Sequence, residues 1–337
     1  MPSVSIIIPC YNEQDTIQSL LEAVYAQTFP RHDLDVVIAE GLSTDGTRAQ
    51  IAAFVRSHPD LHITVLDNPV RNIPAALNCA LKEANGEIIV RLDAHSVPYP
   101  DYIERSVADL QTGLGDNVGG IWEIHPGAQT WVAQSIAVAA SHPLAVGDAL
   151  YRHTNKAAQV DTVPFGAFKR EVLALIGFFD ESLLTNEDYE FNARIHKSGG
   201  KVWLDPAIRS VYFARPTLAA LARQYNRYGF WKWCMLRRYP ETIRWRQGLP
   251  PLFVLSLLGG ALLAIFFPIF RVFLAMEILV YCIVLAASAI QAALRQKKGF
   301  LVIGLPLAIA TMHIAWGAGF LWSMIKGALA QSKPERK

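Results

Sequence analysis

Three long apolar stretches near the C-terminus constrain the fold of this chain more than any other feature. Residues 249–270 and 300–325 contain no Asp, Glu, Lys or Arg, and residues 272–294 contain only Glu277. Each stretch has about 22 to 26 residues, which is enough for a helix to cross the roughly 30 Å hydrocarbon core of a bilayer. One such stretch could be a buried helix of a soluble core. Three in succession predict two or three membrane spans within residues 249–327.

The charges around these stretches predict an orientation. The turn at residues 295–298 is basic, so the positive-inside rule places it in the cytoplasm. This agrees with an in–out–in hairpin in the cytoplasmic membrane and with a catalytic domain on the cytoplasmic side. A third full span would put the basic tail, residues 328–337, outside. The number of crossings therefore stays open, and Pro306, Gly317 and Gly319 permit a break in the last stretch.

Glu277 is the one carboxylate within these stretches. A charged group inside a bilayer is costly and usually faces a partner or a water-filled cavity. We expect Glu277 to pair with Arg271 or Arg295, or to lie near an end of its helix.

A basic and aromatic segment separates the apolar stretches from the rest of the chain. Residues 1–214 carry 15 basic and 26 acidic side chains, whereas residues 215–246 carry 8 basic and 1 acidic, interleaved with Tyr, Trp and Phe. We expect residues 215–248 to form interfacial helices, with rings at headgroup depth and cations near phosphates. Nucleic acid is the alternative partner for such a mixture, but the adjacent apolar stretches favour the lipid bilayer. Arg and Lys also suit a lipid diphosphate.

Residues 1–214 show strands alternating with helices. The expected strands are 4–9, 34–39, 63–66 and 87–92, and the expected helices are 16–26, 48–57 and 73–84. This alternation predicts an α/β domain with a mostly parallel sheet. Asn12 is expected to cap the first helix. Residues 111–165 have the weakest pattern, and we expect them to form part of the wall of a substrate site.

The loops that follow the four expected strands predict a ligand site, because ligands of open α/β sheets bind at the carboxyl ends of the strands. These loops contain Glu13, Glu40, Asp45, Asp67, Arg71, Asp93 and His95. Polar loops are also polar simply because they face water. Several acidic residues after consecutive strands favour a site.

Asp93 and His95 are the predicted metal ligands. A carboxylate at a strand end, with a second ligand two residues later, can hold a divalent cation against a diphosphate and so neutralise charge on a leaving nucleotide. The imidazole favours Mn²⁺ over Mg²⁺.

Three carboxylates within four positions open another expected helix, at Glu187, Asp188 and Glu190. An inverting sugar transfer needs a carboxylate that takes the proton of the acceptor hydroxyl. The alternative is an acidic helix N-terminus that complements the helix dipole.

These motifs together resemble family 2 of the glycosyltransferases with the GT-A fold, over roughly residues 3–245. The match follows the chain through Ile8–Glu13, Glu40–Thr47, Asn78, Gly86–Glu87, Arg91–His95, Val163–Arg170, Gly177–Glu181, Asn186–Asp188 and Arg223–Gly229. Within the family, the chain is most similar to the succinoglycan-type membrane glucosyltransferases that act on lipid-linked saccharides.

The resemblance implies a Rossmann-like catalytic domain and a role for each matching residue. It makes Asp188 the catalytic base, with Glu187 beside it, and Asp93 and His95 the ligands of the metal and diphosphate. The resemblance implies that the nucleotide sugar is bound by Pro9, Tyr11, Glu13, Glu40, Asp93, Gln224, Arg227 and Tyr228. We add Asp45 and Arg71 to this set because they lie in the strand-end loops.

Three positions depart from the family pattern. Glu40 stands where Asp is usual, His95 replaces the second Asp of Asp-x-Asp, and Tyr228 replaces a Trp, so processive synthesis does not follow from that motif.

The sequence as a whole predicts an inverting, metal-dependent enzyme of cell-surface polysaccharide assembly. It would move a sugar from a UDP-sugar to a polyprenyl-diphosphate-linked saccharide. The alternatives are transfer to polyprenyl phosphate itself, a processive synthase, and a non-enzymatic membrane scaffold with a degenerate nucleotide fold.

Overall fold

The computed structural model describes residues 1–331, which form two compact units. The first unit comprises residues 1–123 and 150–212, and the second comprises residues 124–149 and 213–331. Residues 124–149 therefore group with the C-terminal helices, although they lie inside the expected domain 1–214. Of the expected tail 328–337, residues 332–337 lie outside the described residues.

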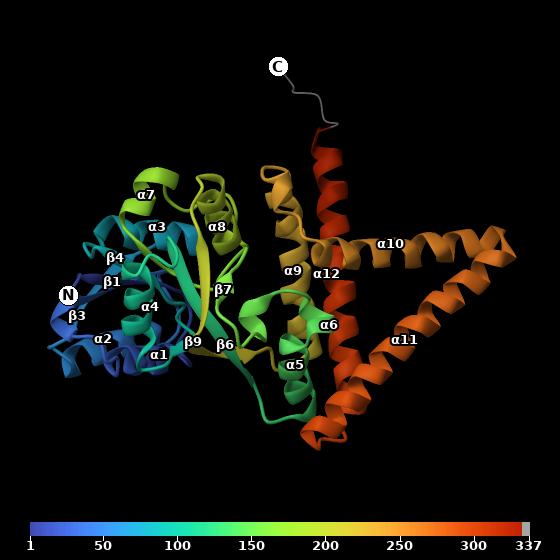
Figure 1. Ribbon diagram of the computed structural model, residues 1–337, viewed down its shortest axis with the longest axis horizontal. Coiled ribbons are helices and arrows are strands. Elements are labelled where there is room, and N and C mark those ends of the chain that lie inside the picture. The colour runs from blue at the N-terminus through green and yellow to red at the C-terminus, as the bar shows by residue number, and fades with distance from the viewer. Residues whose placement is uncertain (332–337) are drawn as a thin grey trace. The chain divides into compact units, whose positions relative to one another are not determined.

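The first unit is built on a mixed sheet with helices on both faces (Figure 1). Within residues 1–331 the sheet has nine strands in the order β3-β2-β1-β4-β8-β6-β9-β5, and β7 pairs with β9. The strands are β1 (Val4–Cys10), β2 (Leu34–Glu40), β3 (His62–Asp67), β4 (Ile88–Arg91), β5 (Val97–Pro98), β6 (Asn117–Pro126), β7 (Ala158–Gln159), β8 (Ala167–Lys169) and β9 (Val202–Ala214). The helices are α1 (Ile17–Tyr25), α2 (Thr47–Ser57), α3 (Ile73–Glu83), α4 (Tyr102–Gln111), α7 (Glu171–Ile176) and α8 (Glu187–Lys197), with short 3-10 turns η1 (Arg31–Asp33) and η2 (Leu150–Arg152).

The predicted parallel half of the sheet is confirmed. β1 pairs in parallel with both β2 and β4, and β2 pairs in parallel with β3. β8 then pairs antiparallel with β4 and with β6, so the sheet changes direction beside β4. The four strands expected from the sequence thus end at one edge, where their loops can form a site.

Alternating side chains of β1 fill two cores on opposite faces of the sheet. Ile6 and Ile8 pack with α1, α2 and α4, whereas Ile7 packs with α3, α7 and α8. A strand buried on both faces explains the β-branched run that marks β1 in the sequence.

The expected capping role of Asn12 is wrong. Helix α1 begins at Ile17, and its N-cap residue is Thr16. Asn12 has a positive φ of 53°, and its side-chain oxygen accepts a hydrogen bond from the Thr44 amide, 2.9 Å away. Asn has a short polar side chain that tolerates this left-handed backbone, so the residue shapes a loop instead of a helix end.

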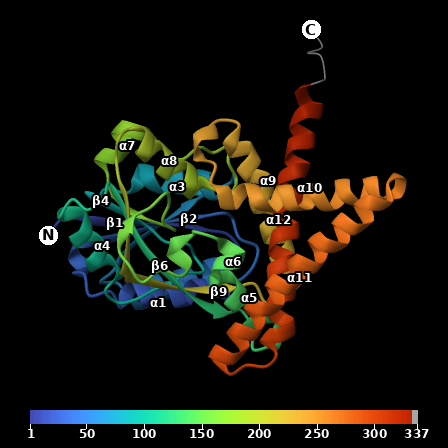
Figure 2. The same cartoon turned by 45° about the vertical axis from the view of Figure 1, so that its right-hand side comes forward.

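The second unit is helical. It contains α5 (Trp131–Ser141), α6 (Pro143–Val146), α9 (Leu218–Leu236), η3 (Pro240–Thr242), α10 (Trp245–Phe266), α11 (Pro268–Gln296) and α12 (Leu301–Gln331). In Figures 1 and 2, α9 and α12 run side by side, while α10 leads away from α12 and α11 returns to it. Among the described residues, α10, α11 and α12 are the three helices long and apolar enough to cross a membrane.

Helix α12 is continuous from Leu301 to Gln331, so the break that Pro306 or the glycines would permit does not occur. The glycines serve close packing. A Cβ on Gly319 would lie 2.1 Å from the Asn226 carbonyl oxygen of α9, and one on Gly317 would lie 2.4 Å from the Pro250 carbonyl oxygen of α10. Small residues permit such close contact between helix backbones, as is common in membranes.

The expected pairing of Glu277 with Arg271 or Arg295 is also wrong. The Glu277 carboxylate accepts a hydrogen bond from the Ser256 hydroxyl of α10. Arg271 instead donates from Nε to the Ala264 carbonyl oxygen at 2.9 Å. A polar contact between α10 and α11 therefore lies within the hairpin that these two helices form.

We expect Gly319→Ala to destabilise the second unit by about 1 to 3 kcal/mol, because the added methyl would overlap the α9 backbone. The measurement is thermal unfolding of the detergent-solubilised chain. Gly259→Ala in α10 is the matched control, since a Cβ there meets nothing within 4 Å. Equal unfolding temperatures for the two variants would contradict the close α9–α12 packing.

Candidate active site

The loops after β1 and β2 are tied together at the sheet edge. The Asn12 amide donates to the Ser43 hydroxyl at 2.8 Å, and the Glu13 amide donates to the Thr47 hydroxyl at 2.8 Å. These bonds join the Ile8–Glu13 motif to the Glu40–Thr47 motif. They place Tyr11 and Glu13 on a loop whose shape is set by its neighbour.

Asp45 shapes the start of α2. Its carboxylate accepts hydrogen bonds from the Thr47 amide at 3.0 Å and from the Gln14 amide at 3.3 Å. The hydrogen bond from the Thr47 side chain holds the pKa of Asp45 below its usual value. These contacts give Asp45 a structural role, and its contact with a nucleotide stays a prediction.

Glu40 is fully buried at the end of β2. Its carboxylate accepts from the backbone amides of Leu42 and Ser43, at 3.0 and 2.8 Å, and from Arg48. Arg48 also contacts Asp67 at the end of β3, and hydrogen bonds to the two carboxylates raise the pKa of its guanidinium. Glu40 thus organises the loop that follows it. Recognition of a base or ribose by Glu40 stays a prediction.

Tyr11 and Arg71 form an accessible pair beside this loop. The Tyr11 ring is 41% exposed, and the Arg71 guanidinium carbon lies 5.7 Å from the ring centroid. Gly41 allows this arrangement, because a Cβ there would lie 2.8 Å from the Tyr11 ring. An exposed ring next to a cation suits a base and a phosphate. Pro9, by contrast, is buried within β1.

Arg91 at the end of β4 contacts three of the carboxylates in the sequence motifs. Its side chain donates to Asp93 at 3.0 Å and to Glu187 at 2.8 Å, and it also pairs with Asp188. The residue is only 1% exposed. One guanidinium therefore joins the predicted metal-binding loop to the predicted catalytic helix, which lies 97 residues further along the chain.

The charge of Arg91 is maintained by these neighbours. Burial lowers the pKa of its guanidinium, but the negative charges of Asp93 and Glu187 outweigh that effect and raise the pKa. A buried charge requires such pairing, since an unpaired one is very costly. No role of its own was predicted for Arg91 from the sequence. The available signal was a single charge within the buried apolar run from Ile88 to Leu92.

Helix α8 presents two of its three leading carboxylates to Arg91. Asn186 precedes the helix with a left-handed backbone, at φ 70°. Glu187 is then buried, whereas the Asp188 side chain keeps 25% of its surface exposed. The third carboxylate, Glu190, binds Arg194 at 2.6 Å instead. Asp188 is therefore the carboxylate of this group best placed to meet a substrate.

The loop after β4 carries both predicted metal ligands. The His95 Nδ1 atom faces the Glu13 Oε1 atom at 3.1 Å, and the other Glu13 oxygen accepts from the Thr16 hydroxyl at 2.7 Å. Among residues 1–331, His, Cys, Asp and Glu form no group of three or more that could hold a metal ion. Cations at nucleotide sites commonly use one or two protein ligands and complete their shell with phosphate oxygens. Asp93 and His95 fit that chemistry.

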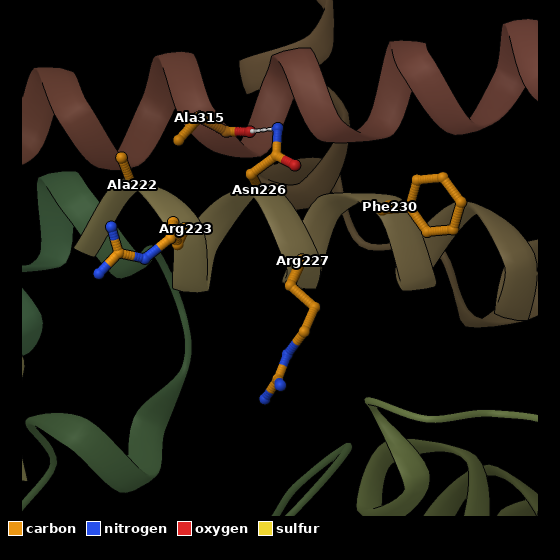
Figure 3. Close-up of a pocket in the computed structure, with 6 residues that line it drawn as sticks. All are labelled: Ala222, Arg223, Asn226, Arg227, Phe230 and Ala315. Carbon is orange, nitrogen blue, oxygen red and sulfur yellow. Dashed lines mark hydrogen bonds between the residues drawn. The ribbon is translucent and has the colours of Figure 1, made fainter. Parts of the chain in front are cut away.

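Gln224, Arg227 and Tyr228 belong to the second unit, on helix α9. The Gln224 Nε2 atom donates to the Tyr228 hydroxyl at 2.9 Å, one helical turn away. Arg227 lines an open hollow on the same helix (Figure 3). Closure of these three residues over a donor stays a prediction.

A match to a known sequence family identifies the kind of protein that carries this site. The sequence model of glycosyl transferase family 2 matches residues 5–177, which include the β1, β2 and β4 motifs. The chain belongs to glycosyl transferase family 2. It is therefore a glycosyltransferase with a GT-A-like catalytic fold, as the motifs predicted.

Relatives of known name cover nearly the whole of this glycosyltransferase. The succinoglycan biosynthesis protein ExoA of Rhizobium meliloti is 32% identical over 318 residues, 94% of this chain and 93% of that protein. The dolichyl N-acetyl-alpha-D-glucosaminyl phosphate 3-beta-D-2,3-diacetamido-2,3-dideoxy-beta-D-glucuronosyltransferase of Methanococcus voltae is 27% identical over 334 residues, 97% of this chain and 98% of that protein.

A solved structure supports the fold. The mannosyltransferase of Pyrobaculum calidifontis, in complex with GDP-Man and Mn²⁺, is 22% identical and has a TM-score of 0.64. The match covers 96% of this chain and 88% of that chain.

We expect Arg91→Met to destabilise the first unit by about 3 to 5 kcal/mol, because three carboxylates would then share a buried region without a cation. Arg91→Lys should recover part of the loss, since an ammonium keeps the charge but cannot contact several carboxylates as a planar fork does.

Thermal unfolding of the full chain measures both effects. Arg105→Met is the matched control: it breaks the surface pair with Asp101 and should cost less than about 1 kcal/mol. A similar small cost for Arg91→Met would show that the carboxylates do not depend on Arg91.

Proposed function

We propose that this glycosyltransferase moves a sugar from a UDP-sugar to a polyprenyl-diphosphate-linked saccharide, with inversion, in the assembly of a cell-surface polysaccharide. The observation that carries the proposal is the convergence of Asp93, Glu187 and Asp188 on Arg91 at the edge of the sheet. The group combines Asp93, the carboxylate expected to face the diphosphate, with Asp188, the accessible carboxylate expected to act as the base. A scaffold with a degenerate site has no need of such a group.

The names of the relatives support the acceptor. One relative is named for succinoglycan biosynthesis, and the other for transfer to a dolichyl-phosphate-linked sugar. Three helices able to cross a membrane suit a substrate that is itself held in a bilayer. The basic turn between α11 and α12 supports a catalytic unit on the cytoplasmic side.

In the proposed reaction, Asp188 takes the proton of the acceptor hydroxyl. The acceptor oxygen attacks the anomeric carbon as the bond from that carbon to the β-phosphate oxygen breaks, and UDP leaves with both bonding electrons. Such a base is typically worth about 10² to 10⁴ in rate. Arg91 contacts the Asp188 carboxylate from the buried side, and Glu187 accepts a hydrogen bond from the same guanidinium.

Asp93 and His95 would hold a divalent cation at the diphosphate, with Mn²⁺ preferred to Mg²⁺ because of the imidazole. When bound, the cation supplies positive charge against the leaving diphosphate. Tyr11 and Arg71 lie on the neighbouring loops, where a base and a phosphate would be recognised.

The donor and acceptor are tested by a panel of UDP-sugars with GDP-mannose as comparison, measuring nucleotide release with native membranes as the source of acceptor. We expect release from a UDP-sugar and a lipid-linked product one sugar longer. A sugar attached directly to polyprenyl phosphate, or a polymer of high molecular weight, would contradict the proposed acceptor. Release from GDP-mannose alone would contradict the proposed donor.

We expect Asp188→Asn to lower kcat by at least about a hundredfold while UDP binding persists, because the amide cannot accept the proton. The measurements are UDP release and calorimetric titration with UDP. Glu171→Gln on α7, an acidic residue outside the site, is the matched control and should keep full activity. Near-normal activity of Asp188→Asn would remove Asp188 as the base.

We expect a chelator to abolish transfer and Mn²⁺ to restore it more fully than Mg²⁺. His95→Asp should reverse or remove that preference, because a carboxylate lacks the affinity of an imidazole for the softer ion. The measurement is the metal concentration that gives half-maximal UDP release. Transfer that is indifferent to chelation would overturn the metal assignment.

A further inference from the structure

Helix α9 carries an open hollow of about 500 Å³. Its lining residues are Ala222, Arg223, Asn226, Arg227, Phe230 and Ala315 (Figure 3). Residues at positions i, i+4 and i+8 of a helix share a face, so Ala222, Asn226 and Phe230 form one row. Arg223 and Arg227 form the adjacent row. The hollow thus combines a mostly apolar wall with two guanidinium groups.

Within residues 1–331, no carboxylate neutralises either guanidinium. Both Arg223 and Arg227 are exposed, and among residues 1–331 neither forms an ion pair with a carboxylate. Other arginines of the second unit are engaged: Arg246 pairs with Asp148, and Arg271 donates to a backbone carbonyl. Two uncompensated charges one helical turn apart repel each other, and a bound anion would relieve that repulsion.

Phe230, at the end of the apolar row, lies beside a second ring and a third cation on α12. The Lys326 ammonium lies 5.8 Å from the Phe230 ring centroid and 5.6 Å from the Trp322 ring centroid. Trp322 is 52% exposed, and the neighbouring Ile325 is 51% exposed. The hollow therefore borders an exposed apolar surface on a helix able to cross a membrane.

The walls of the hollow are fixed by the contact between α9 and α12. The Asn226 side chain donates to the Ala315 carbonyl oxygen at 3.4 Å, and a Cβ on Gly229 would lie 2.1 Å from the Trp316 carbonyl oxygen. Helices in such close contact cannot shift without separating. A preformed site loses little free energy to ordering when it binds a ligand.

We propose that this hollow binds the phosphate or diphosphate of a lipid-linked saccharide. Arg223 and Arg227 contact the phosphoryl oxygens, and the apolar chain lies against Phe230 and Trp322. Guanidinium groups suit phosphate because their donors match its oxygens in pairs. The inference rests on the proposed function, since it gives the lipid-linked acceptor a binding site. It also gives Arg227 a ligand other than the nucleotide sugar expected from the sequence.

The test is equilibrium binding of farnesyl diphosphate to the full chain in phosphatidylcholine nanodiscs, without donor or metal. We expect Arg223→Gln to weaken binding by about tenfold to a hundredfold, the usual worth of a charge-assisted hydrogen bond. Arg227→Gln should weaken binding similarly. Arg237→Gln removes the same charge from the end of α9, outside the hollow, and should change affinity by less than about threefold.

Competition separates the possible sources of the phosphate. Inorganic diphosphate should compete much more weakly than farnesyl diphosphate, because it lacks the apolar chain; equal competition would overturn the site for a lipid phosphate. Nanodiscs with phosphatidylglycerol distinguish a carrier diphosphate from a membrane headgroup. Loss of farnesyl diphosphate binding in those discs would assign the site to the headgroup phosphate, and retained binding would assign it to the carrier.

Failure of this binding site can be distinguished from failure of the proposed function. Calorimetric UDP binding and the thermal unfolding temperature should be the same in Arg223→Gln as in the parent chain. If Arg223→Gln and Arg237→Gln bind farnesyl diphosphate equally, the hollow is not the site, whereas sugar transfer to a lipid-linked acceptor could still be measured by UDP release. Absence of that transfer would instead overturn the proposed function.

Discussion

The buried guanidinium of Arg91 is the contact on which the candidate active site depends. It lies at the end of β4, between β1 and the antiparallel strand β8, and it contacts Asp93, Glu187 and Asp188. Without a cation, three carboxylates at this point would repel one another and resist burial. The guanidinium allows a loop after β4 and the start of α8 to meet. Arg91 thereby holds three carboxylates together at the sheet edge, where they would otherwise repel one another.

The sequence predicted the elements more fully than the contacts between them. The β-branched runs at β1 and β2 and the apolar periodicity of α1 and α3 are local signals, and the structure confirms them. The reach of Arg91 to α8 is a contact across 97 residues, which no local pattern encodes. Asn12 shows the same limit: its residue type fits both a helix cap and a left-handed loop position, and only the Thr44 amide, 32 residues further along the chain, decides between them.

The predicted site residues differ in the same way: the sequence predicted where they lie, but not which atoms they contact. Glu40 and Asp45 were chosen because acidic residues follow strands, but their oxygens accept hydrogen bonds from their own loops. Tyr11, Arg71 and Asp188 keep exposed surface, which a substrate needs. In the second unit, composition predicted the three long apolar segments. It could not tell whether Gly317 and Gly319 break a helix or bring two helices together, because both roles require a missing side chain.

The contact between α9 and α12 has a mechanical consequence. Gly229 and Gly319 leave no space for α9 to slide or roll on α12. A helix of 31 residues that is long for a bilayer adjusts by tilting, and the tilt changes with bilayer thickness. Because α9 packs against α12 without space to slide, a tilt of α12 in a membrane would carry the arginines of α9 with it. Lipid composition would then alter the position of the site proposed on α9, without any lipid binding to the catalytic unit.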